Sequence, residues 1–268
     1  MGLERYHQKR NFRVTPEPKG KVGKRTDSLL RFIIQKHAAS RLHYDFRLEL
    51  GGVLLSWAVP KGPSLDPNDK RLAMHVEDHP VEYGTFEGVI PEGYGAGIVM
   101  LWDQGAWTPQ VEDVDAALKK GDLKFTLDGY KLQGSWVLVR TSGRDPGSGG
   151  DRSWLLIKHK DEWAGDLDIT TFAPKSVKSD GEFEDILAQD RPDVWESNRS
   201  GGRPAQGGEA GEMLAQIIKR AMEIKAGRAG RGTAARSATT NTQTAKTAKT
   251  AKTAKQKSGA AKRGSAKA

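Results

Sequence analysis

The sequence contains no cysteine among its 268 residues. This absence excludes disulfide bonds, thiolate catalysis and cysteine-based zinc sites, and it suits a reducing compartment. The sequence also lacks any apolar run approaching the ~20 residues that a helix needs to cross a bilayer. Its first residues, MGLERYHQKR, lack the apolar segment of a secretion signal. We therefore expect a cytoplasmic protein, located at the nucleoid, with no membrane partner.

Acidic residues are missing from the C-terminal part of the chain. Residues 228–268 contain 11 lysines and arginines and no acid, and TAK occurs four times in succession from Thr244. Residues 198–268 as a whole carry 16 basic and 3 acidic residues, which leaves 27 basic and 31 acidic residues in 1–197 from chain totals of 43 and 34. A cationic segment of such low complexity is too polar to fold alone and attracts polyanions such as DNA. We expect residues 198–268 to form a disordered basic tail with a short amphipathic helix at about 211–226.

Residues 29–160 read as a succession of short strands. Runs such as RFIIQKH, YDFRLEL, VLLSWAV and GSWVLVRT are apolar or alternating, and Gly, Pro and Asp separate them. About eight such strands predict a mainly all-β fold, a compact β-barrel or sandwich with short helices. We place the barrel at 28–165. A polar N-terminal arm at 1–27 without core residues is expected to precede it, and an acidic, irregular extension at 166–197 with little core capacity to follow it.

The stretch KHAASRLHYDFRLEL carries an unusual set of polar side chains. Side chains two apart in a strand share a face, so the apolar residues face the core and the polar ones share the other face: His43, Asp45 and Arg47. His37 needs only a bend in HAASR to join them. Two imidazoles and a carboxylate suit Mn, Fe, Co, Ni or Zn and leave open positions for substrate. An ordinary solvated strand face is the alternative that spacing leaves open.

A second stretch, RLAMHVEDHP, also alternates. Its apolar members are expected to face the core: Leu72, Met74 and Val76. Arg71 and His75 are then on the polar side, with His75 as an ordinary surface histidine. His79 stands at a strand end, a suitable place for an acid/base group, because a histidine's ordinary pKa lies near neutral pH. Lys61 follows another strand and is either an anion contact or a solvated turn lysine.

Several long blocks resemble a known family. FIIQKHAASRLHYDFRLELGGVLLSWAVPKGP, EDHPVEYGTFEGVIPEGYGAG, VMLWDQGAW and WLLIKH are similar to the 3′-phosphoesterase domain of bacterial DNA ligase D, over roughly Arg10 to Lys160. The resemblance implies a β-barrel enzyme that uses Mn²⁺ to remove a terminal 3′-ribonucleoside and then the 3′-phosphate, leaving a 3′-OH. Its expected substrates are DNA 3′ ends in a primer–template or nicked duplex. Ku, ligase or polymerase are the partners it implies in trans.

The resemblance assigns residues to three roles. The metal ligands are His37, His43 and Asp45. The catalytic residues are His79, Arg47, Lys61, Arg71 and Tyr83. The substrate-binding residues are Arg10, Glu17 and Gln35, two of them in the N-terminal arm, which is thereby expected to contribute to the site.

Two departures from the family pattern keep other functions open. Asn11 stands where the family commonly has Asp, and the loop IPEGYGAG is one residue shorter than usual. A decayed site would leave a non-catalytic DNA-end-binding adaptor or nucleoid-associated protein that recruits ligase or polymerase. A metal-dependent small-molecule phosphatase fits the same chemistry but leaves the basic tail unexplained.

Overall fold

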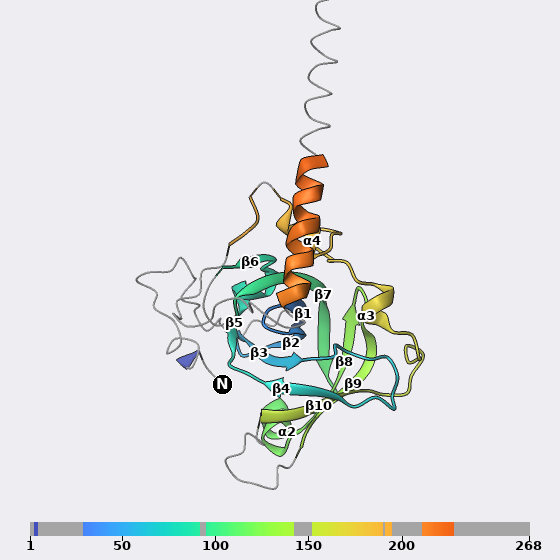
Figure 1. The fold of residues 1–268 in the computed structure, drawn as a ribbon. Coiled ribbons are helices and arrows are strands. Elements are labelled where there is room, and N and C mark those ends of the chain that lie inside the picture. The colour runs from blue at the N-terminus through green and yellow to red at the C-terminus, as the bar shows by residue number, and fades with distance from the viewer. Residues whose placement is uncertain are drawn as a thin grey trace, which may run out of the picture. The chain divides into compact units, whose positions relative to one another are not determined.

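The computed structural model describes residues 3–4, 29–91, 95–141, 152–189, 191–194 and 211–227 (Figure 1). The strands are β1 (Arg31–Ala38), β2 (Leu42–Leu50), β3 (Val53–Val59), β4 (Arg71–His75), β5 (His79–Pro80), β6 (Gly88–Ile90), β7 (Gly97–Pro109), β8 (Asp122–Gly129), β9 (Gln133–Arg140) and β10 (Ser153–Lys158). The helices are the 3-10 helix η1 (Val81–Thr85), α2 (Val114–Lys120), α3 (Ile169–Phe172), α4 (Phe183–Leu187) and a helix over 211–227. None of these described helices is long and apolar enough to cross a membrane.

Eight antiparallel strands close into a barrel. Their order is β1-β2-β3-β4-β10-β9-β8-β7, and β7 returns to pair with β1. Two short strands lie outside this ring, with β6 paired to β7 and β5 paired to β3. The mainly all-β barrel with short helices expected from the sequence is therefore confirmed.

Aromatic side chains fill the barrel interior. Phe46 stacks on Phe125 with ring centroids 5.9 Å apart, and Trp57 meets Trp154 edge-on at 6.0 Å. An eight-stranded barrel has an interior just wide enough for side chains. Since that space holds the core, the polar face of β2 lies on the outside of the barrel.

The two faces of β4 are the reverse of the expected ones. Leu72 is 43% exposed, whereas Ala73 is fully buried in the core. His75, two residues further on the inward face, is partly exposed and lies 5.1 Å from the Trp57 ring and 6.4 Å from the Trp154 ring, so it is not the fully solvated surface histidine expected from the sequence. The core takes the small Ala73 here because large indoles already occupy the space around it.

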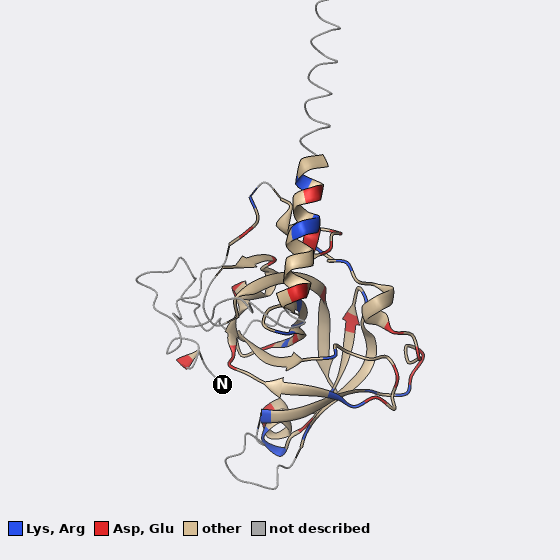
Figure 2. Ribbon diagram, in the orientation of Figure 1, with Lys and Arg blue, Asp and Glu red and all other residues tan. Residues whose placement is uncertain are grey.

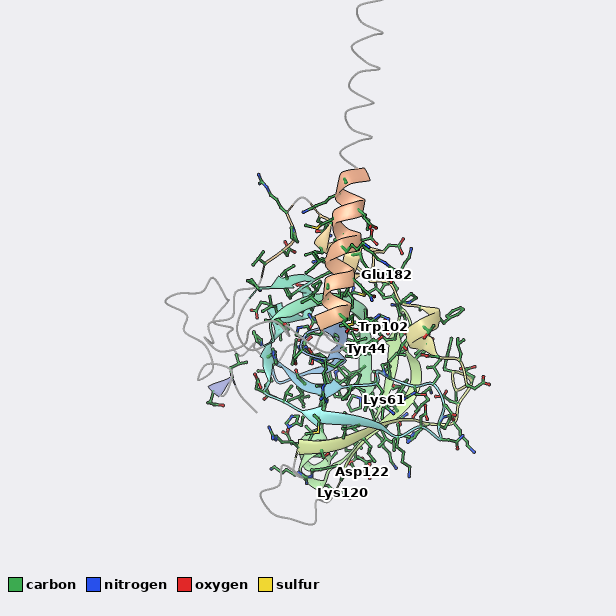
Figure 3. The ribbon with its side chains drawn as sticks, in the orientation of Figure 1. Tyr44, Lys61, Trp102, Lys120, Asp122 and Glu182 are labelled. Carbon is green, nitrogen blue, oxygen red and sulfur yellow. The ribbon has the colours of Figure 1, made fainter. Side chains whose placement is uncertain are left out.

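The segment after the barrel has more core capacity than its acidic sequence suggests. Three of its apolar residues are buried in the main core: Ile169, Phe183 and Ile186. It covers the barrel end where Tyr44 and Trp102 meet, 5.3 Å apart (Figure 3). The Trp102 indole N–H donates to the Ala173 carbonyl at 2.8 Å. The expectation of little core capacity at 166–197 was wrong, because a few apolar residues suffice to close a barrel end.

Two further segments contribute to the core. Leu3, in the N-terminal arm, is buried in the main cluster, so the expectation that this arm holds no core residue was wrong.

In the helix 211–227, Ile217 and Ala221 are buried, and Arg220 lies 3.6 Å from the Glu184 carboxylate. The remaining surface of this helix carries charges of both signs (Figure 2). The rest of the expected C-terminal tail lies outside the described residues.

Candidate functional site

Strands β1 and β2 bring the sequence-predicted metal ligands together. The antiparallel register pairs polar residues across the two strands: His37 with His43, and Gln35 with Asp45. Facing residues in an antiparallel pair project to the same side of the sheet. The turn between the strands supplies the bend that His37 needs, and the two imidazole rings therefore lie 4.8 Å apart.

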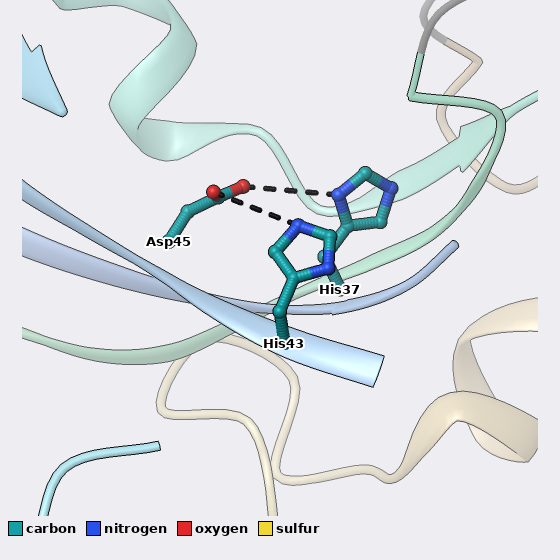
Figure 4. A group of neighbouring side chains, drawn as sticks. All are labelled: His37, His43 and Asp45. Atoms are coloured by element: carbon teal, nitrogen blue, oxygen red, sulfur yellow. Dashed lines mark ion pairs between the residues drawn. The ribbon is translucent and has the colours of Figure 1, made fainter. Parts of the chain in front are cut away.

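Three side chains converge on one point of the outer barrel face (Figure 4). His37 Nδ1 lies 3.7 Å from Asp45 Oδ2, and His43 Nε2 lies 3.7 Å from Asp45 Oδ1. One ligand atom from each residue lies within 4.8 Å of the others. The two 3.7 Å separations fit ligand atoms that each lie about 2.0–2.2 Å from a shared ion.

Backbone carbonyls orient both imidazoles. His37 Nε2 lies 2.9 Å from the Gly95 carbonyl, and His43 Nδ1 lies 2.9 Å from the Arg41 carbonyl. A carbonyl only accepts hydrogen bonds, so these nitrogens carry the ring proton. The lone pairs of neutral rings then lie on His37 Nδ1 and His43 Nε2, the atoms that face Asp45. Such second contacts commonly fix the tautomer of a metal-binding histidine.

The electrostatics favour the metal-binding protonation states. Burial alone would raise the pKa of the Asp45 carboxyl, but Arg47 and the two histidines outweigh burial and hold that pKa well below its usual range. Burial lowers the pKa of His43, against the opposing effect of the Asp45 carboxylate. An ionised carboxylate and a neutral imidazole are the forms that ligate metals.

Arg47 connects the metal ligands to the rest of the site. Its Nε donates to Gln35 Oε1 at 2.9 Å, and its Nη1 donates to Ser56 Oγ at 2.7 Å. Its Nη2 donates to Asp45 Oδ2 at 3.1 Å. The face of the Tyr83 ring lies 5.0 Å from the guanidinium carbon. With 2% of its surface exposed, Arg47 is held from four directions and fixes the Asp45 carboxylate.

The segment from β5 to β6 covers this face of the barrel. Gln35 Nε2 donates to the carbonyls of Tyr83 and Phe86, at 3.1 and 2.9 Å. The His79 ring lies 5.1 Å from the Tyr83 ring, and its Nδ1 lies 2.8 Å from the Glu77 carbonyl. Gln35, Tyr83 and His79 are thus parts of one layer around Arg47.

Two predicted catalytic cations, Lys61 and Arg71, follow β3 and begin β4. Lys61 is exposed in the turn that follows β3. Arg71 begins β4 on the same face as the inward Ala73, and its guanidinium donates to Asp69 at 2.8 Å. Among the described residues, neither cation forms a hydrogen bond or ion pair with a metal ligand, so their catalytic roles stay predictions.

Other expectations fall outside the described residues. These are Arg10, Asn11 and Glu17 of the N-terminal arm and part of the IPEGYGAG loop, residues 92–94. The described part of the loop contains Gly95, whose carbonyl orients His37.

Sequence reasoning missed two members of the site. Ser56 supplies the oxygen for Arg47 Nη1, and only the pairing of Arg47 with Ser56 across β2 and β3 reveals it. Gly95 acts through its backbone carbonyl, which no side-chain pattern reveals. The one signal available in the sequence was a serine within the run VLLSWAV, whose other residues are apolar.

Comparisons with known proteins match the part of the chain that contains this site. Residues 35–140 match the family model of the DNA ligase D 3′-phosphoesterase domain. The chain is 51% identical over 214 residues to the multifunctional non-homologous end joining protein LigD of Pseudomonas aeruginosa, covering 78% of this chain and 24% of that protein. It is 45% identical over 161 residues to the LigD end joining DNA repair protein of Mycobacterium tuberculosis, covering 60% of this chain and 20% of that protein.

The chain thus spans about a quarter of the length of these curated relatives, or less. The matched region contains the second half of β1 and all of β2 to β9, and with them all three metal-binding candidates. The resemblance drawn from the sequence is confirmed, because residues 35–140 match the DNA ligase D 3′-phosphoesterase domain and the chain is 51% identical to a LigD protein over 214 residues.

Proposed function

We propose that this protein is a metal-dependent phosphoesterase that processes DNA 3′ ends for repair by end joining. It removes 3′-phosphate and 3′-ribonucleoside groups and leaves a 3′-OH. The observation that supports this most directly is the convergence of His37, His43 and Asp45 beside the buried Arg47. The names of the relatives, all end joining proteins, support the repair role.

The residues that would hold the metal are His37, His43 and Asp45. Their two imidazoles and one carboxylate accept several divalent ions, and the family resemblance favours Mn²⁺ among them. A bound divalent ion supplies positive charge that polarises phosphoryl oxygens. The carbonyls of Gly95 and Arg41 keep the two imidazoles in the required tautomers.

For the 3′-phosphate, the reaction is hydrolysis. The oxygen of a water molecule forms a bond to phosphorus, the bond from phosphorus to the 3′ oxygen breaks, and that oxygen takes up a proton. His79 is the proposed donor of this proton. Its Nδ1 is engaged by the Glu77 carbonyl, so Nε2 is the atom that carries the transferred proton.

Cationic and hydroxyl groups then act on the phosphate. Arg47 has five N–H donors, of which at least three bind protein atoms, so it holds Asp45 and offers its remaining donors to phosphoryl oxygens. Lys61 and Arg71 would add charge once DNA is bound. Tyr83 lies beside His79 and is proposed to contact the same phosphate.

Substrate binding is proposed to involve three further residues in different ways. Arg10 and Glu17 would reach the DNA end from the N-terminal arm. Gln35 is fully buried, and both ends of its amide bind protein atoms. Its proposed contribution is therefore to hold Arg47 and the covering segment in place for the substrate.

The proposed partners follow from the same function. DNA ends are the substrate, and Ku, a ligase or a polymerase would supply the subsequent steps in trans. The basic residues at 228–268 would add sequence-independent affinity for DNA through phosphate contacts and counterion release. Such a protein works in the cytoplasm at the nucleoid.

The test is removal of phosphate from a primer–template with a 3′-phosphate, with and without Mn²⁺. Wild-type protein should release phosphate only with metal, and His43→Ala and Asp45→Ala should each abolish release. His159→Ala, a histidine outside the triad, serves as the control and should retain activity. Full metal-dependent activity in His43→Ala would contradict the assigned ligands. If the wild-type protein binds DNA ends without releasing phosphate, the adaptor function replaces the enzyme.

A further inference from the structure

A segment beyond the matched family region binds the cover of the site. We call residues 83–90 the roof, since they carry the Tyr83 ring that lies over Arg47. We call residues 173–178 with 193–194 the clamp, since they bind the outside of the roof and its neighbour β7. The clamp lies beyond residues 35–140, where the family match ends.

The firmest contact between clamp and roof is a buried pair. Ser176 and Glu87 are 4% and 5% exposed, and the Ser176 hydroxyl donates to Glu87 Oε2 at 2.5 Å. The direction of this bond is fixed, because the Ser176 oxygen also accepts from the backbone N–H groups of Lys178 and Ser179. Its single proton is therefore left for Glu87. The same carboxylate oxygen accepts from the Leu101 N–H at 2.9 Å, so one buried group joins clamp, roof and barrel.

Backbone contacts hold the clamp at two further places. Val177 N–H donates to the Leu101 carbonyl at 2.9 Å, and Val89 N–H donates to the Asp193 carbonyl at 2.8 Å. The second contact is so close that a Cβ on Gly88 would lie 2.1 Å from the Asp193 oxygen. A glycine at this position thus allows residue 193 to lie directly on the roof.

An exposed lysine adds a weaker contact. Lys178 Nζ donates to the Thr85 carbonyl at 3.0 Å and lies 3.8 Å from the Asp193 carboxylate. Because both side chains of the ion pair are largely solvated, the pair contributes little. The buried Ser176 hydroxyl is therefore the main side-chain contribution of the clamp.

The roof connects this hydroxyl to the metal ligands. Glu87 follows Phe86, whose carbonyl accepts from Gln35 Nε2 at 2.9 Å. Gln35 Oε1 accepts from Arg47 Nε, and Arg47 Nη2 donates to Asp45 Oδ2. A displaced roof therefore shifts Gln35 and loosens the guanidinium that holds the Asp45 carboxylate.

We propose that Ser176 is a positioning residue for the metal site, acting through Glu87 and the roof. The clamp is thus a functional part of the domain although it lies outside residues 35–140, the region that the family model matches. The effect on turnover rests on the proposed function, whereas the effect on the roof does not. Removing a contact that supports metal ligands commonly lowers metal affinity or activity on the order of 10- to 100-fold.

The first experiment follows hydrogen–deuterium exchange of the full chain without metal. Ser176→Ala should accelerate amide exchange at residues 83–90 by about tenfold, the effect of losing one buried hydrogen bond, and leave β8 and β9 unchanged. Ser179→Ala is the matched control, because only the backbone N–H of this exposed residue binds Ser176. Lys178→Met should give a smaller acceleration and provides a second test if Ser176→Ala does not fold. Unchanged amide exchange at residues 83–90 in both variants would overturn the proposal that the clamp holds the roof in place.

The second experiment measures Mn²⁺ affinity and release of a 3′-phosphate. Ser176→Ala should weaken both by about tenfold, and Ser176→Thr, which keeps the hydroxyl, should restore them. In a Gln35→Leu background, where no amide joins the roof to Arg47, the further effect of Ser176→Ala should vanish. A full additive effect there would contradict action through the roof. An inactive wild-type protein would contradict the proposed function alone, since exchange and Mn²⁺ affinity still decide the role of Ser176.

Discussion

The buried guanidinium of Arg47 determines how the candidate site is built at the scale of residues. A buried charge is stable only when it is paired and hydrogen-bonded. Asp45 supplies the charge, while Gln35 and Ser56 supply neutral oxygens. Each of these side chains therefore has a structural task in addition to any chemical one.

Ser56 provides the sharpest test of this arrangement. Ser56→Ala removes the oxygen that accepts from Arg47 Nη1 and leaves a buried N–H without its partner. The free energy of unfolding should fall by about 1–3 kcal/mol, measured by urea denaturation in the presence of a chelator. Ser179→Ala, on the surface, should change it by less than about 0.5 kcal/mol. Equal stabilities of the Ser56 variant and the wild type would show that Arg47 finds another partner.

Asp103 predicts a pH dependence of stability away from the metal site. Its carboxylate is fully buried and accepts from the backbone N–H groups of Gln104, Lys131 and Leu132. Burial raises its pKa from 3.8 to about 6, against the effect of those three donors. The folded protein thus binds this proton more tightly than the unfolded chain. The stability it contributes is fully present below about pH 4 and is lost as the pH rises through about 6.

Asp103→Asn isolates this contribution. Between pH 4 and 7, the free energy of unfolding of the wild type should fall relative to that of the variant by up to about 3 kcal/mol. Urea denaturation with a chelator measures it without interference from metal binding. Parallel pH profiles, or a relative gain in wild-type stability with rising pH, would contradict the raised pKa.

At the scale of elements, the turn after β3 seals one end of the barrel. Gly62 has φ +70°, and a Cβ there would lie 2.9 Å from both the Tyr44 ring and the Thr170 methyl group. Gly51, in the turn between β2 and β3, has φ +59° but open space around it. Gly62→Ala and Gly51→Ala should both lose about 1 kcal/mol from left-handed backbone strain. Gly62→Ala should lose about 1–3 kcal/mol more from overpacking, measured by chemical denaturation. Equal losses of stability in the two variants would show that α3, which carries Thr170, moves away from the new methyl group without cost.

The elements also differ in how much their sequence predicts. The alternation in β2 is strict, so the core face and the metal-binding face could both be predicted from it. In β4 the same reasoning was wrong, because neighbouring indoles require Ala73 inside and leave Leu72 exposed. Phe183 and Ile186 are at helical spacing, but α3 and α4 are only four and five residues long, so the place of Ile169, Phe183 and Ile186 at the barrel end depends on contacts far apart in sequence. The Gly95 carbonyl and Ser56 escape prediction for the same reason.

At the scale of the whole molecule, acidic and basic character separate along the chain. The 11 cations without an acid lie at 228–268, outside the described residues. Removing them tests the proposed DNA affinity, and the cut belongs after Gly227. A cut after Ser197 would also remove Ile217, which is buried in the core.

The shortened protein should bind duplex DNA more weakly. Because each phosphate contact contributes about −0.9 to the slope of log affinity against log salt, that slope should become shallower. Fluorescence anisotropy measures the DNA affinity at salt concentrations between about 50 and 200 mM. Over this interval the affinity is expected to change by about tenfold or more, which is enough to compare the two slopes. Turnover at saturating DNA should stay unchanged. A collapse of turnover at saturation would instead place these residues in the site.

The central claim is that His37, His43 and Asp45 hold one ion that is needed for 3′-phosphate removal. The most direct measurement titrates Mn²⁺ into the protein, follows bound metal by electron paramagnetic resonance, and assays phosphate release in the same samples. For the wild type, release should rise in step with occupancy of a single strong site. In His43→Ala, that site and the release should be lost together. A strong site that persists in His43→Ala with full release, or wild-type release that is independent of occupancy, would contradict the account.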